Sequence, residues 1–476
     1  MKGLGVAAAV ILILAGCAIG GNIQAPQPQS ELPAHWQERQ PGEPGAAAPL
    51  VNVDLGAWWK SFEDPLLSRL ISDAVAANHD LRIAAGRLLE ARARLRGANA
   101  GQAPVLGASG RAVHQRISEN GPQGRQPQAN LEGELFESGF DASWEIDLFG
   151  FVHRNVDVAT ADVQAAEEAG RDVLISLLAE VGRNYVQLRS QQQRLAIVRQ
   201  NLATQQETLS LVRSRFDAGL AADQDVARAE ALVAATSAQV PAFETQVELL
   251  IYRLSILAGR PPGALLPELT QLSPLPERAV TVGIPLGLPS DLLRRRPDIR
   301  TAERQLLAAT FRKGVARADL YPHFFLTGAA GLQSLEAGDF FSTSSRLFSI
   351  GPTVRWSVFD FGRVRANIAV QDAKVEQLLA VYEKSILTAL GDVESALVAL
   401  DREIIRQQAL VEAAQASQRA MNSSLDLYRQ GLTTYLTVLD SERQVLLSDD
   451  LLAQSRAAVL LNRVSLYKAL GGGWTE

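Results

Sequence analysis

The sequence predicts a mainly helical chain that carries one small β-sheet and is built as a tandem repeat. Trp-Glu-Ile-Asp-Leu-Phe-Gly at 144–150 and Trp-Ser-Val-Phe-Asp-Phe-Gly at 356–362 mark the same junction twice, 356 − 144 = 212 residues apart. Each junction follows alternating, strand-like sequence and precedes a long helical pattern. The offset persists beyond the junctions, since Gly219 corresponds to Gly431. A repeat at a fixed offset indicates duplication of one sheet-and-helix unit.

Long helical stretches follow both junctions. In the second copy, apolar residues recur in heptads over 363–428 and no proline interrupts them, which predicts one continuous helix. A glycine then marks a turn, because glycine readily adopts the positive φ that ends a helix, and a return helix is expected over 434–470. The first copy predicts the same hairpin from 151–216 and 223–257, with Pro241 expected to kink the return helix.

Two β-hairpins are expected ahead of the junctions. Apolar and polar residues alternate over 136–148 and 348–358, and the partner strands are expected over 105–117 and 324–333. Strands of about ten residues can cross a bilayer at a tilt, and aromatic residues lie near their ends. A soluble sheet whose apolar face covers a core is the alternative interpretation. If the strands span a membrane, the chain must oligomerise, because four strands cannot close a barrel and open edges are not tolerated in lipid.

The alternation also predicts an orientation for the membrane interpretation. Residues two apart in a strand share a face, and here one face is rich in aromatic residues whereas the other is polar. The side chains expected to face lipid are Phe140, Trp144, Phe348 and Trp356, and those expected to face the lumen are Asp141, Glu145 and Arg355.

A helical region precedes each β-hairpin. Apolar residues recur at helical spacing from Pro65 to about Gly101, with Asp80 expected as the N-cap of a second helix, and the second copy repeats this pattern. With these helices the two repeats extend over 51–259 and 290–476. The proline-rich residues 260–289 between them are expected to form an irregular connecting strap.

The N-terminus is typical of a bacterial lipoprotein. Residues 1–16 have the positive charge and short apolar run of a signal peptide, and Leu14-Ala15-Gly16-Cys17 fits the lipobox, so Cys17 is expected to carry lipid. An ordinary signal peptide with an incidental cysteine is the alternative. Ala18 is not the aspartate that signals inner-membrane retention, which favours the outer membrane. Residues 17–50 are rich in Pro, Gln, Gly and Ala and predict an extended tether.

Composition excludes several classes of function. The net charge of −6 argues against binding to nucleic acid, and the single cysteine excludes an intramolecular disulfide. The five histidines are scattered without metal-ligand spacing, and no nucleophile elbow or phosphate-binding loop occurs. We therefore expect neither an enzyme nor a metal site, and no cofactor apart from the lipid on Cys17.

The whole pattern resembles the TolC family of outer-membrane efflux ducts, and within it the lipidated, NodT-like branch that serves resistance-nodulation-division pumps. The resemblance implies a homotrimer with a twelve-stranded barrel in the outer membrane and a coiled-coil helical tunnel through the periplasm. It also implies passive export of drugs or other small molecules, driven by an inner-membrane pump and joined to it by a periplasmic adaptor. The residues that carry the resemblance are the two Phe-Gly junctions, the Gly-Leu pairs at the hairpin tips, Trp58-Trp59 with Phe62 and Asp64-Pro65, Leu288-Pro289-Ser290-Asp291-Leu292-Leu293, and Arg295-Arg296-Pro297-Asp298-Ile299.

The resemblance assigns a role to the hairpin tips. It implies that Gly219 with Leu220, and Gly431 with Leu432, contact the adaptor. Many family members have valine before this glycine, whereas this chain has alanine or glutamine there, so the adaptor preference does not follow from the motif.

The resemblance also implies an aperture at the end of the tunnel far from the barrel. Leu436 and Asp440 match its constricting positions, where an aspartate from each chain would concentrate negative charge. Arg228 occupies the position in the first repeat that is equivalent to Asp440 in the second (440 − 212 = 228). Because the two residues have opposite charges, Asp440 is expected to meet Arg228 of a neighbouring hairpin. A solvated surface carboxylate is the alternative interpretation of Asp440.

Other assignments stay open. An outer-membrane duct for type I protein secretion shares the same architecture. A periplasmic adaptor lipoprotein also contains helical hairpins, but it would carry one hairpin within a small β-domain, whereas this sequence predicts two hairpins. The substrate does not follow from the sequence, because the inner-membrane pump selects it.

Overall fold

The computed structural model describes residues 26, 33–37, 54–120, 131–276, 284 and 286–474. Cys17 and the predicted signal peptide lie outside these residues, as does most of the predicted tether. The chain divides into two units, each described separately below. The first contains Arg87–Glu167 and Thr301–Glu383, and the second contains Ser30–Gly86, Glu168–Arg300 and Lys384–Glu476.

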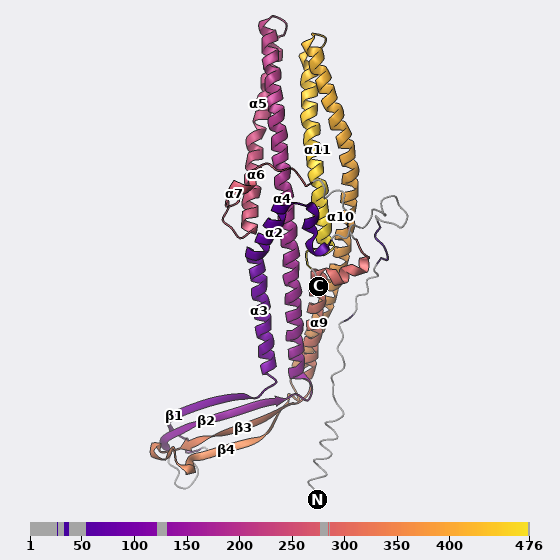
Figure 1. Ribbon diagram of the computed structural model, residues 1–476. Helices are drawn as coiled ribbons and strands as arrows, with labels where there is room; N and C mark the ends of the chain where they lie inside the picture. Colours follow the sequence, from indigo (N-terminus) through magenta and orange to yellow (C-terminus); the bar gives the residue numbers. More distant parts are fainter. Residues whose placement is uncertain are drawn as a thin grey trace. The chain divides into compact units, whose positions relative to one another are not determined.

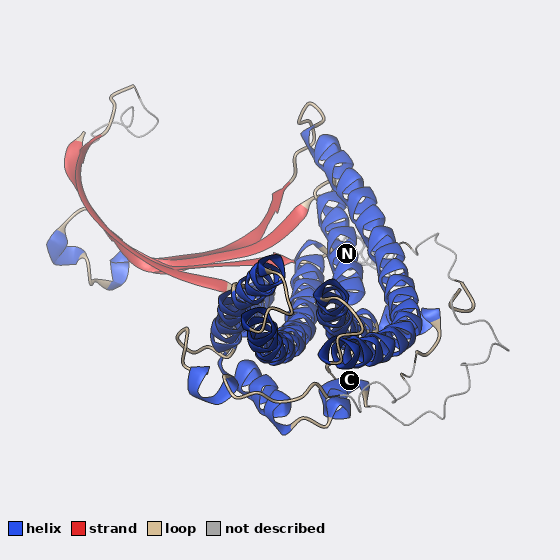
Figure 2. Cartoon of the chain, turned by 90° about the horizontal axis from the view of Figure 1, so that it is seen from above, coloured by secondary structure: helices blue, strands red, loops and turns tan. Residues whose placement is uncertain are grey.

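The first unit contains one antiparallel sheet of four strands in the order β1-β2-β3-β4 (Figure 1). Seen from above, the sheet is strongly curved (Figure 2). Both predicted hairpins are therefore confirmed, with differences at the strand ends. β2 covers 132–146 where 136–148 was predicted, and β4 covers 346–355 where 348–358 was predicted, so Trp356 lies beyond β4. The strands are β1 (Val105–Arg116), β2 (Glu132–Ile146), β3 (His323–Ser334) and β4 (Arg346–Arg355).

The strand register confirms that the sheet has one apolar and one polar face. Phe140 pairs with Ala330, which in turn pairs with Phe348, so these residues share a face. Phe140 is 61% exposed and Phe348 is 85% exposed in the single chain. On the other face, the His323 ring lies 2.7 Å from a Glu145 carboxylate oxygen. Because the apolar face is left uncovered by the described part of this unit, it is available to a partner or to lipid.

The helices of both predicted hairpins are present. The two outgoing helices contain 67 residues each and agree with the predicted ranges to within one residue. The first return helix is interrupted at Ala238, because Pro241 has no N–H to donate to the carbonyl of the residue four positions earlier. The second return helix is continuous. The helices are α4 (Phe151–Asp217), α5 (Asp223–Ser237), α6 (Gln239–Leu257), α10 (Arg363–Arg429) and α11 (Tyr435–Ala469).

The helices before each hairpin are also present, but the predicted cap was wrong. The Asn78 side-chain oxygen accepts from the backbone N–H of Asp80 at 2.8 Å, and Asp80 itself lies inside the first turn of α3. Asparagine suits the cap position at residue 78 because its amide nitrogen also donates to the Leu257 carbonyl at 3.1 Å, and an aspartate has no such donor. The elements are η1 (Leu55–Phe62), α2 (Pro65–Ala77), α3 (His79–Ala100), α7 (Leu266–Leu269), η3 (Pro289–Asp291), α8 (Leu292–Arg295) and α9 (Pro297–Ala318), with short turns η4 (Ala337–Asp339) and η5 (Thr343–Ser345) before β4.

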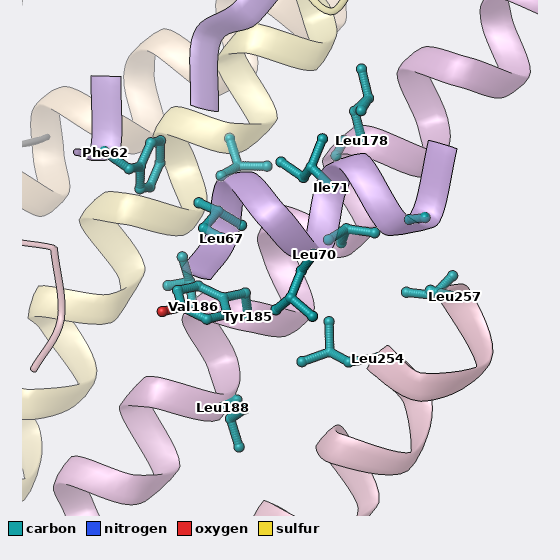
Figure 3. Packing of buried hydrophobic residues seen from close by; sticks show 14 of the residues in the cluster. Phe62, Leu67, Leu70, Ile71, Leu178, Tyr185, Val186, Leu188, Leu254 and Leu257 are labelled. Carbon is teal, nitrogen blue, oxygen red and sulfur yellow. The ribbon is translucent and has the colours of Figure 1, made fainter. Parts of the chain in front are cut away.

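The main core of the second unit gathers α2 between the long helices. Leu67 and Leu70 of α2 pack against Tyr185 of α4 and Leu254 of α6 (Figure 3). Trp58 of η1 stacks on Tyr467 of α11 with ring centroids 5.3 Å apart. Each fully buried leucine of this kind stabilises the fold by about 1.5–3 kcal/mol. Because the core contains residues of both helical hairpins, it holds both of them against the short helix α2.

One point of the predicted tether is anchored to the second unit. Trp36 is 5% exposed, and its indole N–H donates to the Gly287 carbonyl at 3.0 Å. The backbone N–H of Gln37 donates to a Glu394 carboxylate oxygen at 2.7 Å. The low-complexity composition predicted an extended segment and gave no indication of this contact.

Candidate functional site: the hairpin ends

Both hairpin tips are built by the same backbone cap. Gly219 has φ +74° and Gly431 has φ +77°, the left-handed conformation that glycine adopts without strain. The N–H of Leu220 donates to the Arg215 carbonyl at 2.8 Å, and that of Leu432 donates to the Leu427 carbonyl at 2.9 Å. These bonds satisfy the last carbonyls of α4 and α10. The cap leaves both leucines projecting outward, 67% and 69% exposed.

A second apolar core joins the two hairpins close to their tips. It takes residues from all four helices, so each hairpin end is covered by the other rather than by solvent. The side chains are Leu209 and Val212 of α4, Ala229 and Leu232 of α5, Met421 and Tyr428 of α10, and Tyr435, Val438, Leu439 and Val445 of α11.

Arg215 connects the two tips directly. One guanidinium nitrogen, Nη1, donates to the carbonyls of Tyr428 and Arg429 at 3.1 and 3.3 Å. The same group lies 4.9 Å from the centre of the Tyr428 ring. The sequence did not single out Arg215, because its repeat counterpart is Leu427 and no motif marks either position. That asymmetry between otherwise matched tips is the signal that could have identified it.

A second polar connection lies further along the hairpins. Arg194 of α4 makes two bonds to the Asp450 carboxylate of α11, at 2.6 and 3.1 Å. Its guanidinium also lies 4.8 Å from the Phe243 ring. This pair is about three-quarters buried, so it is screened less than a surface pair. The repeat aligns Arg194 with Arg406, and no sequence motif marks either position.

The predicted aperture residues lie on the outer face of α11. Leu436 is 46% exposed and Asp440 is exposed, whereas Tyr435 and Leu439 are buried in the shared core. Leu436 and Asp440 are four residues apart and therefore lie on one face of the helix. Arg228 of α5 has its guanidinium 3.7 Å from Asp225 in the same helix. Its predicted pairing with Asp440 of a neighbouring hairpin stays a prediction.

The Arg-Arg-Pro-Asp motif has a structural role within the second unit. Arg296 is 9% exposed and binds both carboxylate oxygens of Asp298, at 3.0 and 2.7 Å. It also donates to Asp392 of α10 at 3.0 Å and to the Ala469 carbonyl of α11 at 3.2 Å. This single guanidinium therefore fixes the start of α9 to the second hairpin.

Among the helices of the described residues, none combines the length and apolar content required to cross a membrane. Nor do these parts of the chain bring three or more His, Cys, Asp or Glu residues together in an arrangement that could hold a metal ion.

Comparison with known proteins gives matches over nearly the whole chain. The profile of the family described as outer membrane efflux protein matches residues 70–260 and 288–472. The solvent efflux pump outer membrane protein SrpC of Pseudomonas putida is 32% identical, over 98% of this chain and 97% of its own length. Nodulation protein T of Rhizobium leguminosarum bv. trifolii is 30% identical, over 97% and 96%. The solved structure of the outer-membrane channel OprN has a TM-score of 0.87 and 35% identity, covering 96% of this chain and all of that one.

Proposed function

The chain belongs to the outer membrane efflux protein family, and we propose that it is the outer-membrane exit duct of a tripartite efflux system for small molecules. The observation that carries this proposal is the joint presence of a curved four-stranded sheet with an uncovered apolar face and two helical hairpins packed together near their tips. The OprN channel shares this fold over its whole chain, with a TM-score of 0.87. In this role the protein conducts solutes passively and performs no chemical reaction.

Oligomerisation is part of the proposal. The outer edges of β1 and β4 have no strand partner among the described residues, and unpaired edges are not tolerated in lipid. Three copies of a four-stranded sheet would close one twelve-stranded barrel, and the exposed Phe140 and Phe348 would then face lipid. Native mass spectrometry in detergent should give a mass of three chains, and a monomer would contradict the proposal.

The lipid anchor completes the membrane attachment. Cys17 would carry acyl chains in the outer membrane, because the lipobox places the only cysteine of the chain at the predicted cleavage point. Mass spectrometry of the mature N-terminus should identify a lipidated Cys17. A mature chain that begins at another residue and carries no lipid would contradict the predicted acylation of Cys17.

The aperture would be formed by Leu436 and Asp440 from each copy. Their shared exposed face on α11 supports this placement, since it points away from the chain's own core. Asp440→Ala should raise single-channel conductance and weaken block by divalent cations, because a ring of carboxylates attracts and holds cations. Unchanged conductance together with unchanged block would assign Asp440 to an ordinary solvated surface.

Partners would bind at the tips. Leu220 and Leu432 are isolated exposed leucines on repeated caps, which suits shallow contacts with the helical tip of a periplasmic adaptor. A photo-crosslinking amino acid placed at either position should capture an adaptor, and the native complex should contain an inner-membrane resistance-nodulation-division pump. Capture of an ABC transporter complex would favour type I secretion instead.

A further inference from the structure

A cavity of about 440 Å³ lies within the second unit, between α4, α10 and α11. It is lined by apolar groups such as Ile197 and Met421, by several amide side chains, and by the carboxylates of Glu442 and Asp449. Among the described residues that line it, none carries a positive charge. Its volume falls within the range of pockets that bind small organic molecules, about 300–1,000 Å³.

Several polar atoms of this lining have no hydrogen-bond partner among the described residues. Glu442 is 4% exposed, and neither of its carboxylate oxygens is bonded. Gln205 is 3% exposed, and both its amide oxygen and its amide nitrogen lack a partner, as does the side-chain oxygen of Gln193. Native proteins leave few buried polar groups unsatisfied, so this cluster marks the cavity as a place where a polar group, water or ligand, would bind. Four of these five atoms are acceptors, so a bound group would have to supply hydrogen-bond donors.

The Thr208 hydroxyl does not remove this requirement. It lies beside Glu442 but donates to the Thr204 carbonyl at 3.1 Å. Burial raises the pKa of Glu442 to about 7, and Thr208 offsets only part of the rise. Burial raises the pKa of Asp449 as well. Among the described residues that line the cavity, no cation compensates either carboxyl group.

We propose that this cavity binds an elongated organic ammonium ion, in particular an alkyl α,ω-diamine whose two ammonium groups pair with Glu442 and Asp449. The two acids are seven residues apart on α11, which places them about 10 Å apart along the helix axis. That span fits a chain of roughly eight methylene groups, which the apolar lining would cover. The bound diamine would bridge the first hairpin, through α4, to the second. The inference goes beyond the proposed duct function and does not depend on what the duct carries.

Calorimetric titration of the purified full-length protein in non-ionic detergent tests this site, with 1,8-diaminooctane as the probe and 1,8-octanediol as its neutral counterpart. We expect the diamine to bind and the diol not to bind. Glu442→Gln should weaken diamine binding by about tenfold or more, since an ammonium–carboxylate pair is lost. Because Glu442 must be ionised, affinity should also increase from pH 6 to pH 8. Glutamine preserves the shape and removes a buried charge, so this variant should still fold.

Glu230→Gln is the matched control. Glu230 is the repeat counterpart of Glu442, but it is exposed and already paired with Arg213 at 2.7 Å. Its substitution should leave diamine binding unchanged. Equal binding to the wild type and Glu442→Gln would show surface association and overturn the proposal, as would binding of the diol with the same affinity. Absence of any diamine binding would also overturn the proposal and would mean that the cavity holds water alone.

Discussion

Removal of the Arg215 side chain should weaken the connection between the two hairpin tips. A hydrogen bond from a charged donor contributes about 1.5–3 kcal/mol, and the cation–π contact with the buried Tyr428 ring adds about 0.5–2 kcal/mol. Both bonds of Arg215 use the same nitrogen, so we count them once. Arg215→Ala should therefore weaken the connection by about 2–5 kcal/mol, which shifts the equilibrium between joined and separated tips by at least about 30-fold.

Single-channel recording in planar bilayers measures this shift as the fraction of time spent at the higher conductance. Arg213→Ala is the control, because Arg213 lies two residues away on α4 but pairs with Glu230 of its own hairpin, and both side chains are at least half exposed. Such a pair contributes only about 0.2–1 kcal/mol, so its loss should change the occupancy by less than about fivefold. If the two variants give the same open fraction, Arg215 does not hold the tips together.

A methyl group at Gly182 would lie 2.7 Å from the buried Trp58 ring, whereas one at Gly170 on the same helix meets nothing within 4 Å; Gly182→Ala should therefore be less stable than Gly170→Ala by about 1–3 kcal/mol in thermal unfolding, since the gain in helix propensity is common to both. The raised pKa of Glu442 means that its contribution to stability is complete below its ordinary pKa of 4.5 and is lost as the pH rises to about 7. The melting temperature of the wild type should therefore fall over that pH interval. It should fall less in Glu442→Gln, which has no carboxyl group at this position, and an identical fall in the variant would refute this assignment. Arginine at Ala142, on the face of Phe140, should cost about 2–4 kcal/mol of assembly and arginine at Ser143 far less, as judged by heat-modifiable migration; equal assembly would contradict the proposed orientation of the strands.

The repeat explains why so much of the fold was predictable from the sequence. Long helices without proline, glycines at both tips and period-two alternation each have a local cause, and two copies of every signal made the boundaries reliable. The ends of strands were less predictable, because pairing partners rather than local sequence decide where β2 begins and where β4 ends.

The candidate site was predictable only in part. The tip glycines follow from backbone geometry, whereas Leu436 and Asp440 were identified only through the family resemblance. Arg215, Arg194 and Asn78 were missed because their partners are distant in the chain, at Tyr428, Asp450 and Leu257. Nothing in the local sequence indicates such tertiary bonds.

The buried acid illustrates the same limit. The repeat aligns Glu442 with Glu230 as equivalent residues. In the described part of the chain, however, Glu442 is buried without a hydrogen-bond partner, whereas Glu230 is exposed and forms an ion pair. Their difference depends on which helices surround each position, and a duplicated sequence pattern does not contain that information.

The central claim is that several copies of this chain enclose one passage through the outer membrane. Planar-bilayer recording of the purified wild-type protein tests it most directly. The proposed duct predicts discrete conductance steps of one size that appear only with the assembled, heat-modifiable form. Stable assembly into the bilayer without any conductance steps would contradict it.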